Sequence, residues 1–256
     1  MIILKWIKQL IIKSKSKYEV NTYMEISKQT ALITGANRGL GRHLAQELLA
    51  RGAKVYAGVR NLEMIDLPGV IPIKLNITDE KSIAAAAEIA KDVTLLINNA
   101  GSNTEAALLD GDMEKIRLEM DTHFFGTLSM IRTFAPILEK NGGGTILNIL
   151  SVLSWLSLNG GGAYQAAKSA EWSLTNTFRL VLAPKNILVS GLHVAYMDTD
   201  MTAKIKAPKT NPADIAKIAI DGIEAESYEI VADNLSRMVQ QNLSGGVKTI
   251  YPQLFK

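Results

Sequence analysis

Short apolar runs alternate with helical stretches after Lys28, and this alternation most constrains the fold. The apolar runs are nearly continuous, as expected of strands with helices on both faces of their sheet. The predicted strands are Gln29–Thr34, Lys54–Val59, Val70–Leu75, Val93–Asn98, Thr145–Leu150, Ile187–His193 and Glu229–Val231. The predicted helices are Leu40–Arg51, Glu80–Lys91, Met113–Lys140, Gly162–Leu182, Pro212–Ala225 and Asp233–Leu243. This order predicts an α/β fold with a single doubly wound parallel sheet and helices on both faces.

The chain divides into a short basic extension and one domain. No linker rich in proline, glycine or serine interrupts residues 29–256, and no internal repeat is visible. We therefore expect one dinucleotide-binding catalytic domain over 29–256. Residues 1–28 are rich in lysine and account for the net charge of +3, so the domain lacks the basic excess that nucleic-acid binding needs. No nucleic-acid partner is expected.

The extension has two interpretations that the sequence leaves open. Ile3, Trp6, Ile7, Leu10 and Ile11 fall at helical spacing between lysines, a pattern that can lie on an anionic membrane surface. Residues 1–23 would then make a peripheral membrane contact, because the interrupting lysines leave no apolar run near the ~18 residues of a membrane span. Alternatively, these residues are a disordered extension, or sequence upstream of a natural start near Met24.

The cysteine and histidine content limits metal chemistry and location. The chain has no cysteine, which excludes disulfides and thiolate ligands and is consistent with a cytoplasmic protein. Its three histidines are scattered, so no metal site is expected.

A glycine-rich turn joins the first predicted strand to the first predicted helix. Its glycines have the spacing G-x3-G-x-G, which permits a tight turn and close approach of the backbone to a phosphate. The following helix offers unpaired N–H groups and a positive dipole to the same phosphate. The turn residues expected to contact a dinucleotide are Gly35, Asn37, Arg38, Gly39, Leu40 and Gly41.

The second strand indicates which dinucleotide binds. An NAD site usually has an acidic residue at the end of this strand, but here Arg60 stands in that region. Arg38 lies in the glycine turn, so two guanidinium groups are available for a ribose 2′-phosphate. NADP(H) is therefore predicted in preference to NAD(H).

Tyr164 and Lys168 share one face of a predicted helix because they are four residues apart. A nearby ammonium favours the phenolate form of a tyrosine, which lets the phenol exchange a proton with a substrate oxygen. Ser151, at the end of the preceding strand, can donate a hydrogen bond to the same oxygen. Each motif alone has a neutral explanation as a turn or a surface pair.

Together, the glycine turn, Asn98-Asn99-Ala100-Gly101, Ser151 and Tyr164-x-x-x-Lys168 closely resemble the classical short-chain dehydrogenase/reductase family, with its Rossmann-type fold. The resemblance implies that Tyr164 donates or accepts the proton, that Lys168 lowers the pKa of Tyr164 and binds the nicotinamide ribose, and that Ser151 orients the substrate oxygen. It also implies further cofactor contacts from Asn98, Ala100, Gly101, Tyr164, Lys168 and Thr199. The expected reaction is hydride transfer between the cofactor and a carbonyl or secondary alcohol.

Three positions depart from the family pattern. His123 stands where the family commonly has an asparagine that holds a water near the lysine, and it is retained as a catalytic candidate because histidine also donates and accepts protons. Asn76 replaces an aspartate near the adenine. Val194-Ala195 replaces a Pro-Gly beneath the nicotinamide. If His123 impairs turnover, the alternative is a catalytically weak NADP-binding sensor or scaffold.

The substrate and assembly are less constrained by the sequence. The predicted substrate wall is mainly apolar, which favours a small to medium apolar substrate, although Trp155 and Leu156 fit a core or interface role equally well. The wall residues are Leu153, Trp155, Leu156, Asn159 and Tyr196. The two longest helices look too apolar for one face in water, so a homodimer or homotetramer is expected, with burial inside the chain as the alternative. The candidate interface residues are Met130, Ile131, Phe134, Trp172, Leu174 and Phe178.

Overall fold

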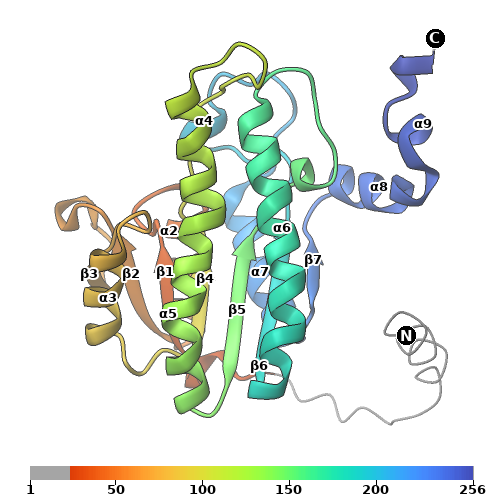
Figure 1. Cartoon of the computed structure of the whole chain (residues 1–256). Helices are drawn as coiled ribbons and strands as arrows, with labels where there is room; N and C mark the ends of the chain where they lie inside the picture. The colour runs from red at the N-terminus through yellow and green to blue at the C-terminus, as the bar shows by residue number, and fades with distance from the viewer. Residues whose placement is uncertain (1–23, 256) are drawn as a thin grey trace, which may run out of the picture.

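The computed structural model describes residues 24–255, and in this part of the chain seven parallel strands form one sheet. The strand order is β3-β2-β1-β4-β5-β6-β7, with all pairs parallel, as predicted (Figure 1). The strands are β1 (Thr30–Thr34), β2 (Lys54–Val59), β3 (Ile71–Lys74), β4 (Leu95–Asn98), β5 (Gly144–Ile149), β6 (Ile187–His193) and β7 (Glu229–Val231). The order reverses between β1 and β4, where doubly wound sheets open a crevice at their carboxyl ends.

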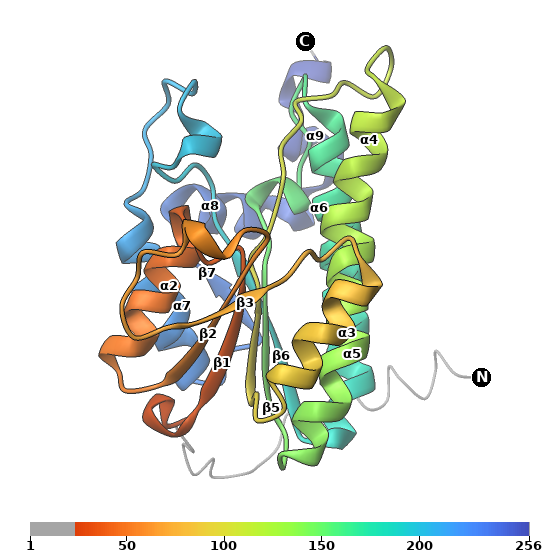
Figure 2. The same cartoon turned by 90° about the vertical axis from the view of Figure 1, so that its left-hand side faces the viewer.

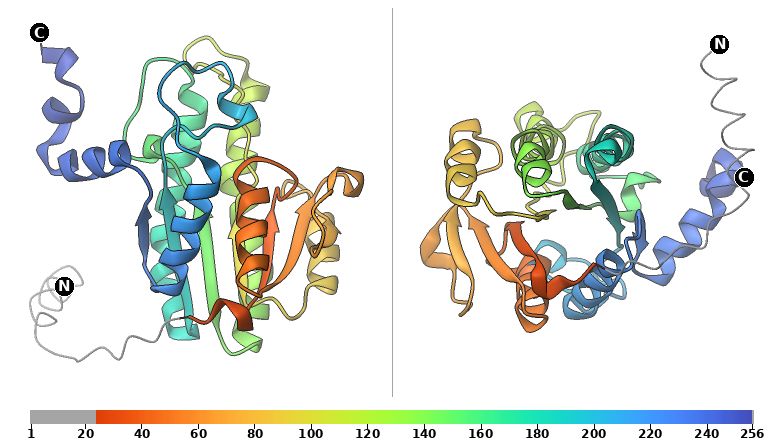
Figure 3. Two further views of the ribbon diagram at one scale, coloured as in Figure 1. Left: turned by 180° about the vertical axis from the view of Figure 1, so that it is seen from behind. Right: turned by 90° about the horizontal axis from the view of Figure 1, so that it is seen from below.

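Helices cover both faces of the sheet (Figure 3). They are α2 (Gly39–Ala50), α3 (Glu80–Ile89), α4 (Met113–Met120), α5 (Thr127–Lys140), α6 (Gly162–Leu182), α7 (Pro212–Glu224), α8 (Asn234–Asn242) and α9 (Gly246–Ile250). One core joins α2 and α7 to the sheet, and the other joins α3, α5 and α6 to the opposite face. Figure 2 shows α3 beside α5 on this second face.

The predicted helix Met113–Lys140 is interrupted in the structure. Between α4 and α5, residues Asp121–Gly126 form a π-helical turn, η3. Such a turn contains one more residue than an α-helical turn and often occurs at functional sites. Helical periodicity alone could not show it, because the apolar spacing continues through the insertion. His123 lies within η3.

The boundary predicted for the N-terminal extension is wrong by a few residues. Ile26, in the short 3-10 helix η1 (Ile26–Lys28), is only 2% exposed, and the Met24 N–H donates to the Glu224 carbonyl over 3.0 Å. Residues 24–28 therefore belong to the domain, because an apolar side chain here completes the core under α2 and α7. The predicted membrane contact of residues 1–23 lies outside the described residues.

The C-terminal segment extends away from the body of the domain. Helices α8 and α9 leave the sheet beside β7 (Figure 1), and α9 was not predicted. The Tyr251 hydroxyl accepts a hydrogen bond of 2.8 Å from the Ser157 N–H, which ties this segment to the loop after β5. No helix within residues 24–255 has the length and apolar character needed to cross a membrane.

Most residues predicted to form a subunit interface are buried within the chain. Met130, Ile131 and Phe134 are 0% exposed and Leu174 is 6% exposed, because they pack between α5, α6 and the sheet. The prediction that they face another subunit is therefore wrong. Exposed apolar side chains do occur on α4, η3 and α6, at Leu118, Phe125, Leu180 and Val181.

Candidate active site

Polar contacts join the carboxyl ends of β1 and β4 at the switch point. The Asn99 amide donates to the carbonyls of Thr34 and Gly35, over 2.9 and 3.2 Å. The Thr34 hydroxyl accepts from the N–H groups of Asn99 and Ala100, each over 2.9 Å. A Cβ on Gly41 would lie 2.3 Å from the Gly35 carbonyl oxygen, so only glycine fits this close turn. The sequence motifs are thus one connected structure.

A pocket of about 580 Å³ opens beside this turn. Its lining includes four residues expected to bind the cofactor: Asn37, Arg38, Gly39 and Thr199. Arg42 and His43 also line it and were missed by the sequence analysis, although Arg42 follows Arg38 by one helical turn. Arg60 is exposed and does not line this pocket, whereas Arg38 does.

The arginines of this pocket are paired with carboxylates. Arg38 Nη1 lies 2.9 Å from Asp200 Oδ2, with both side chains largely exposed. Arg42 is paired with Asp66. An exposed pair such as Arg38–Asp200 contributes little to stability, so an anion can compete for the Arg38 guanidinium.

Two other predicted cofactor residues have local structural contacts. Asn76 Oδ1 accepts from the Thr78 hydroxyl over 3.0 Å and so shapes the turn after β3. Asn98 is 5% exposed, and its amide donates to Asn148 Oδ1 over 2.8 Å. The side chain of Asn98 therefore links β4 to β5, while the backbone that follows leads to Ala100 and Gly101.

The structure places Ser151, Tyr164 and Lys168 at adjoining ends of β5 and α6. Lys168 Nζ lies 5.9 Å from the centroid of the Tyr164 ring and donates to the Ile149 carbonyl and to Glu171 Oε2, each over 2.7 Å. An ammonium has three N–H donors, so one remains for a further acceptor. Ser151 follows β5, and its hydroxyl oxygen accepts from the Leu153 N–H over 3.1 Å.

His123 lies in a closed, charged environment rather than beside solvent. It is 1% exposed, and its Nε2 lies 2.9 Å from the Ser102 carbonyl oxygen and 3.3 Å from Glu119 Oε2. The Ser102 N–H also points at Nε2, over 3.3 Å, so the backbone of Ser102 holds this side of the ring through both of its polar groups. Nδ1 is 3.8 Å from Glu171 Oε2 and has no hydrogen-bond partner within residues 24–255. The imidazole meets the Tyr164 ring edge to face, at 5.2 Å between centroids.

Two buried carboxylates, Glu119 and Glu171, were missed by the sequence analysis. They are 0% and 2% exposed, which is rare for glutamate unless it is paired. Their spacing was the available signal: Glu119 precedes His123 by four residues, and Glu171 follows Lys168 by three. Helical spacing shows that such residues are neighbours, but not that they are buried.

Burial and neighbouring charges together set the pKa values of the catalytic candidates. Burial raises the pKa of Tyr164 above its ordinary value and Glu171 adds to this, against the opposing influence of the Lys168 ammonium and a hydrogen bond with Ser151. For Lys168, burial lowers the pKa, but Glu171, Tyr164 and Glu119 together outweigh it, so the pKa is raised overall. Both groups thus favour their protonated forms.

Glu119 shows the same balance. Burial raises its pKa, but hydrogen bonds from His123 and from the Thr104 N–H outweigh that effect and lower it overall. Glu119 is therefore held as a carboxylate against the loop that follows β4.

Gly101 leaves the space that the His123 ring fills. A Cβ at Gly101 would lie 2.8 Å from Cε1 of His123. We expect Gly101→Ala to destabilise the protein by about 1–3 kcal/mol through overpacking, as measured by urea unfolding. His123→Asn replaces the ring with a smaller group, so the double variant should lose less stability than the two single losses combined. Additive losses would contradict this contact.

Only some of the residues predicted to form the substrate wall are exposed. Trp155 stacks on the buried His193 ring, at 3.6 Å between centroids and 16° between planes, which favours a packing role for this side chain. Leu153, Leu156 and Tyr196 are partly exposed and Asn159 is exposed.

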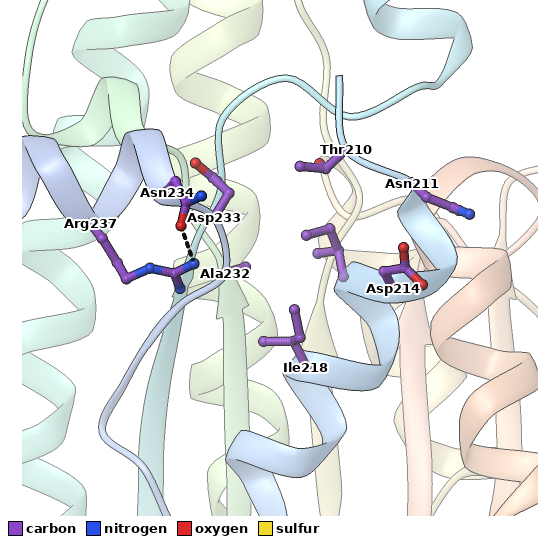
Figure 4. A pocket seen from close by; sticks show the side chains of 9 residues that line it. Thr210, Asn211, Asp214, Ile218, Ala232, Asp233, Asn234 and Arg237 are labelled. Atoms are coloured by element: carbon purple, nitrogen blue, oxygen red, sulfur yellow. Dashed lines mark hydrogen bonds between the residues drawn. The ribbon is translucent and has the colours of Figure 1, made fainter. Parts of the chain in front are cut away.

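A second pocket, of about 270 Å³, lies between the starts of α7 and α8 (Figure 4). Arg237 donates there to Asn234 Oδ1 and to the Val231 carbonyl, each over 2.8 Å, so its guanidinium is engaged in holding the start of α8. This pocket shares no lining residue with the first.

A family model and several named proteins are similar to this chain in sequence. The family model described as short chain dehydrogenase matches residues 29–210. The chain is 32% identical over 191 residues to an NADPH-dependent 1-acyldihydroxyacetone phosphate reductase of Schizosaccharomyces pombe, a match that covers 71% of this chain and 64% of that protein, just under two thirds of its length. It is 32% identical over 200 residues to a trans-4-hydroxycyclohexanecarboxylate dehydrogenase of Sinomonas cyclohexanicum, covering 71% of this chain and 77% of that one.

Solved structures agree with this relationship. A short chain dehydrogenase from Burkholderia cenocepacia in complex with NADP has a TM-score of 0.87 and 37% identity, covering 91% of this chain and 100% of that chain. A 3-ketoacyl-(acyl-carrier-protein) reductase from Brucella melitensis complexed with NADH has a TM-score of 0.74 and 25% identity, covering 81% and 98%. The family match over most of the domain, together with the seven-stranded parallel sheet, identifies the chain as a member of the short-chain dehydrogenase family, whose enzymes are oxidoreductases.

Proposed function

We propose that this enzyme is an NADP-dependent reductase that transfers a hydride between the nicotinamide and the carbonyl or secondary alcohol carbon of a small to medium apolar substrate. The observation that carries the proposal is the position of Tyr164, one turn from a buried lysine and close to Ser151 at the switch-point edge of the sheet. When bound, the cofactor supplies or accepts the hydride, and the protein must then supply or accept a proton.

The side chains of the site can supply this proton and hold the substrate and the cofactor. In carbonyl reduction, Tyr164 donates its phenolic proton to the substrate oxygen, and the Ser151 hydroxyl orients that oxygen by a hydrogen bond. The third N–H of Lys168 is available for the nicotinamide ribose, because the Ile149 carbonyl and Glu171 occupy the other two. The His123 ring packs against the Tyr164 ring, and its Nε2 contacts the Ser102 carbonyl oxygen. We therefore propose that His123 supports the position of Tyr164 and does not itself transfer a proton to the substrate.

The residues around the first pocket fit a phosphate-bearing dinucleotide. No side chain caps the N-terminus of α2, so its N–H groups are available to a phosphate. The guanidinium groups of Arg38 and Arg42 lie in the same pocket, and a 2′-phosphate can displace Asp200 from the exposed Arg38. Asp66 also lines the pocket, but it is paired with Arg42 and so offers less negative charge to repel a 2′-phosphate.

Among the similar proteins, some use NADP(H) and one is bound to NADH. The Burkholderia cenocepacia structure is a complex with NADP and the Schizosaccharomyces pombe reductase is NADPH-dependent, whereas the Brucella melitensis structure is complexed with NADH. Their names cover different substrates. We propose the apolar class for this enzyme from the partly exposed Leu153, Leu156 and Tyr196.

The experiment that tests the proposal measures oxidation of NADPH and of NADH across a panel of ketones, aldehydes and quinones. Turnover that is faster with NADPH supports it. Faster turnover with NADH contradicts the cofactor preference. Tight NADPH binding without turnover on the whole panel favours the alternative of a cofactor-binding sensor, and His123→Asn would then be tested for a gain of activity.

We also propose a homodimer or homotetramer, carried by the exposed Phe125, Leu180 and Val181 on η3 and α6. Paired charge substitutions at Leu180 and Val181 are expected to shift the protein to a smaller species in sedimentation velocity, because each would place a charge in an apolar contact. An unchanged sedimentation coefficient would locate any interface elsewhere.

A further inference from the structure

The active-site lysine is paired with a buried carboxylate, and this pairing has a consequence for the neighbouring tyrosine. Glu171 Oε2 lies 2.7 Å from Lys168 Nζ, and both side chains are almost completely buried. Glu171 Oε1 accepts from the Thr127 hydroxyl over 3.1 Å, so α5 also holds the carboxylate in place. A fixed pair in a low-dielectric site interacts far more strongly than one in water.

The charges around Tyr164 come from three elements. On α6 these are Lys168 and Glu171, on α4 Glu119, and on η3 His123, whose ring meets the Tyr164 ring. The cluster thus contains one ammonium, two carboxylates and an imidazole between them. A lone ammonium beside the phenol would favour phenolate, but here the ammonium charge is already matched by Glu171, and Glu119 adds a further negative charge.

We propose that Glu171 is a positioning residue for the reaction, whose carboxylate neutralises the Lys168 ammonium and, together with Glu119, keeps Tyr164 in the protonated form that carbonyl reduction consumes. This inference rests on the proposed function. In reduction the phenolic O–H bond breaks as the substrate O–H bond forms, so the enzyme is competent only while Tyr164 holds its proton. The equilibrium of the reaction is unchanged, and what Glu171 extends is the alkaline range over which reduction stays at its full rate.

The direction of the pKa of Tyr164 agrees with this geometry, because burial, Glu171 and Glu119 all raise it while Lys168 and Ser151 lower it. His123 lies between the two carboxylates, with Nε2 3.3 Å from Glu119 Oε2 and Nδ1 3.8 Å from Glu171 Oε2. Each buried glutamate has its own hydrogen-bond donors: Ser102 and Thr104 for Glu119, and Thr127 and Lys168 for Glu171.

The test follows the ionisation of Tyr164 by ultraviolet difference spectroscopy, without substrate or cofactor. Subtracting the titration of Tyr164→Phe from that of the full chain isolates this phenol from the other tyrosines. Glu171→Gln keeps the shape of the side chain and removes its charge. We expect it to raise the acid dissociation constant of Tyr164 by about tenfold or more, the order of effect that a nearby charge has in a buried site.

Two matched variants separate charge from packing. Glu171→Asp retains the charge and should titrate close to the original chain, whereas Glu119→Gln should shift the titration in the same direction as Glu171→Gln but less. If Glu171→Gln does not fold, as judged by circular dichroism, Glu119→Gln carries the test. A Tyr164 that ionises at no lower pH in the folded charge-removing variants overturns the proposal.

With a substrate in hand, the alkaline limb of kcat/KM for reduction should move to lower pH in Glu171→Gln and remain in place in Glu171→Asp. A purely structural role would lower stability without moving this limb. The titration needs no turnover, so an inactive enzyme would count against the proposed function and leave the result for Glu171 readable.

Discussion

Tyr164→Phe is expected to lower kcat for carbonyl reduction by about 10²–10⁴-fold, the usual contribution of a positioned general acid. The change removes only the phenolic oxygen, so the ring remains in contact with His123 and α6 keeps its packing. NADPH oxidation with the best substrate of the panel measures kcat, and quenching of protein fluorescence measures the Kd for NADPH.

The control for this variant is cofactor affinity. Because the phosphate-binding turn and Arg38 lie on other elements, the Kd for NADPH should change by less than about threefold. Ser151→Ala should lower kcat by a smaller factor, since it removes a hydrogen bond and not the proton donor. Retention of full turnover in Tyr164→Phe would assign the proton to another group and overturn the proposed mechanism.

Arg38→Ala is expected to lower kcat/KM for NADPH by about 10- to 100-fold and to leave that for NADH nearly unchanged. A charge-assisted hydrogen bond contributes about 1.5–3 kcal/mol, and each 1.4 kcal/mol corresponds to about a factor of ten. The effect is selective because only NADPH carries the 2′-phosphate. Initial rates with both cofactors, at one fixed substrate concentration, give the ratio.

Arg60→Ala is the matched control, because the sequence predicts that Arg60 contacts the cofactor and the structure does not place it in the pocket lining. The sequence pairs Arg60 with Arg38, whereas the structure leaves Arg60 out of the pocket lining that contains Arg38. We therefore expect the loss for Arg60→Ala to be the smaller of the two. If Arg60→Ala loses as much kcat/KM for NADPH as Arg38→Ala, or more, Arg60 also binds the 2′-phosphate, as the sequence predicts. If Arg38→Ala loses equal kcat/KM with NADPH and NADH, Arg38 does not select for NADPH.

Local sequence patterns were sufficient for the sheet and for the backbone of the site. Each strand was predicted to within two residues at either end, because an apolar run between helical stretches has few other folds available. The glycine turn was also predictable, since Gly41 sits where any Cβ would collide with Gly35. Tyr164 and Lys168 were found through a spacing of one helical turn.

Burial was the part that local patterns could not supply. Glu119 and Glu171 look in the sequence like ordinary solvated helix residues, and only the packing of α4, η3 and α6 places them in the interior. The same reason explains the wrong interface prediction, because Met130 and Phe134 have the apolar character of an interface but face the sheet. The π-helical turn at His123 could likewise not be predicted, because helical periodicity continues in the sequence on both sides of it.

The sequence by itself determined the fold class, the order of the elements and the family, because apolar periodicity and short motifs act over a few neighbouring residues. The tertiary structure alone decided which charges meet. Lys168, Glu171, His123 and Glu119 come from elements up to about fifty residues apart, and their 2.7–3.8 Å separations depend on how those elements pack. Electrostatic interactions grow as distance and dielectric fall, so the properties that set the chemistry of Tyr164 arise only when the interior is closed.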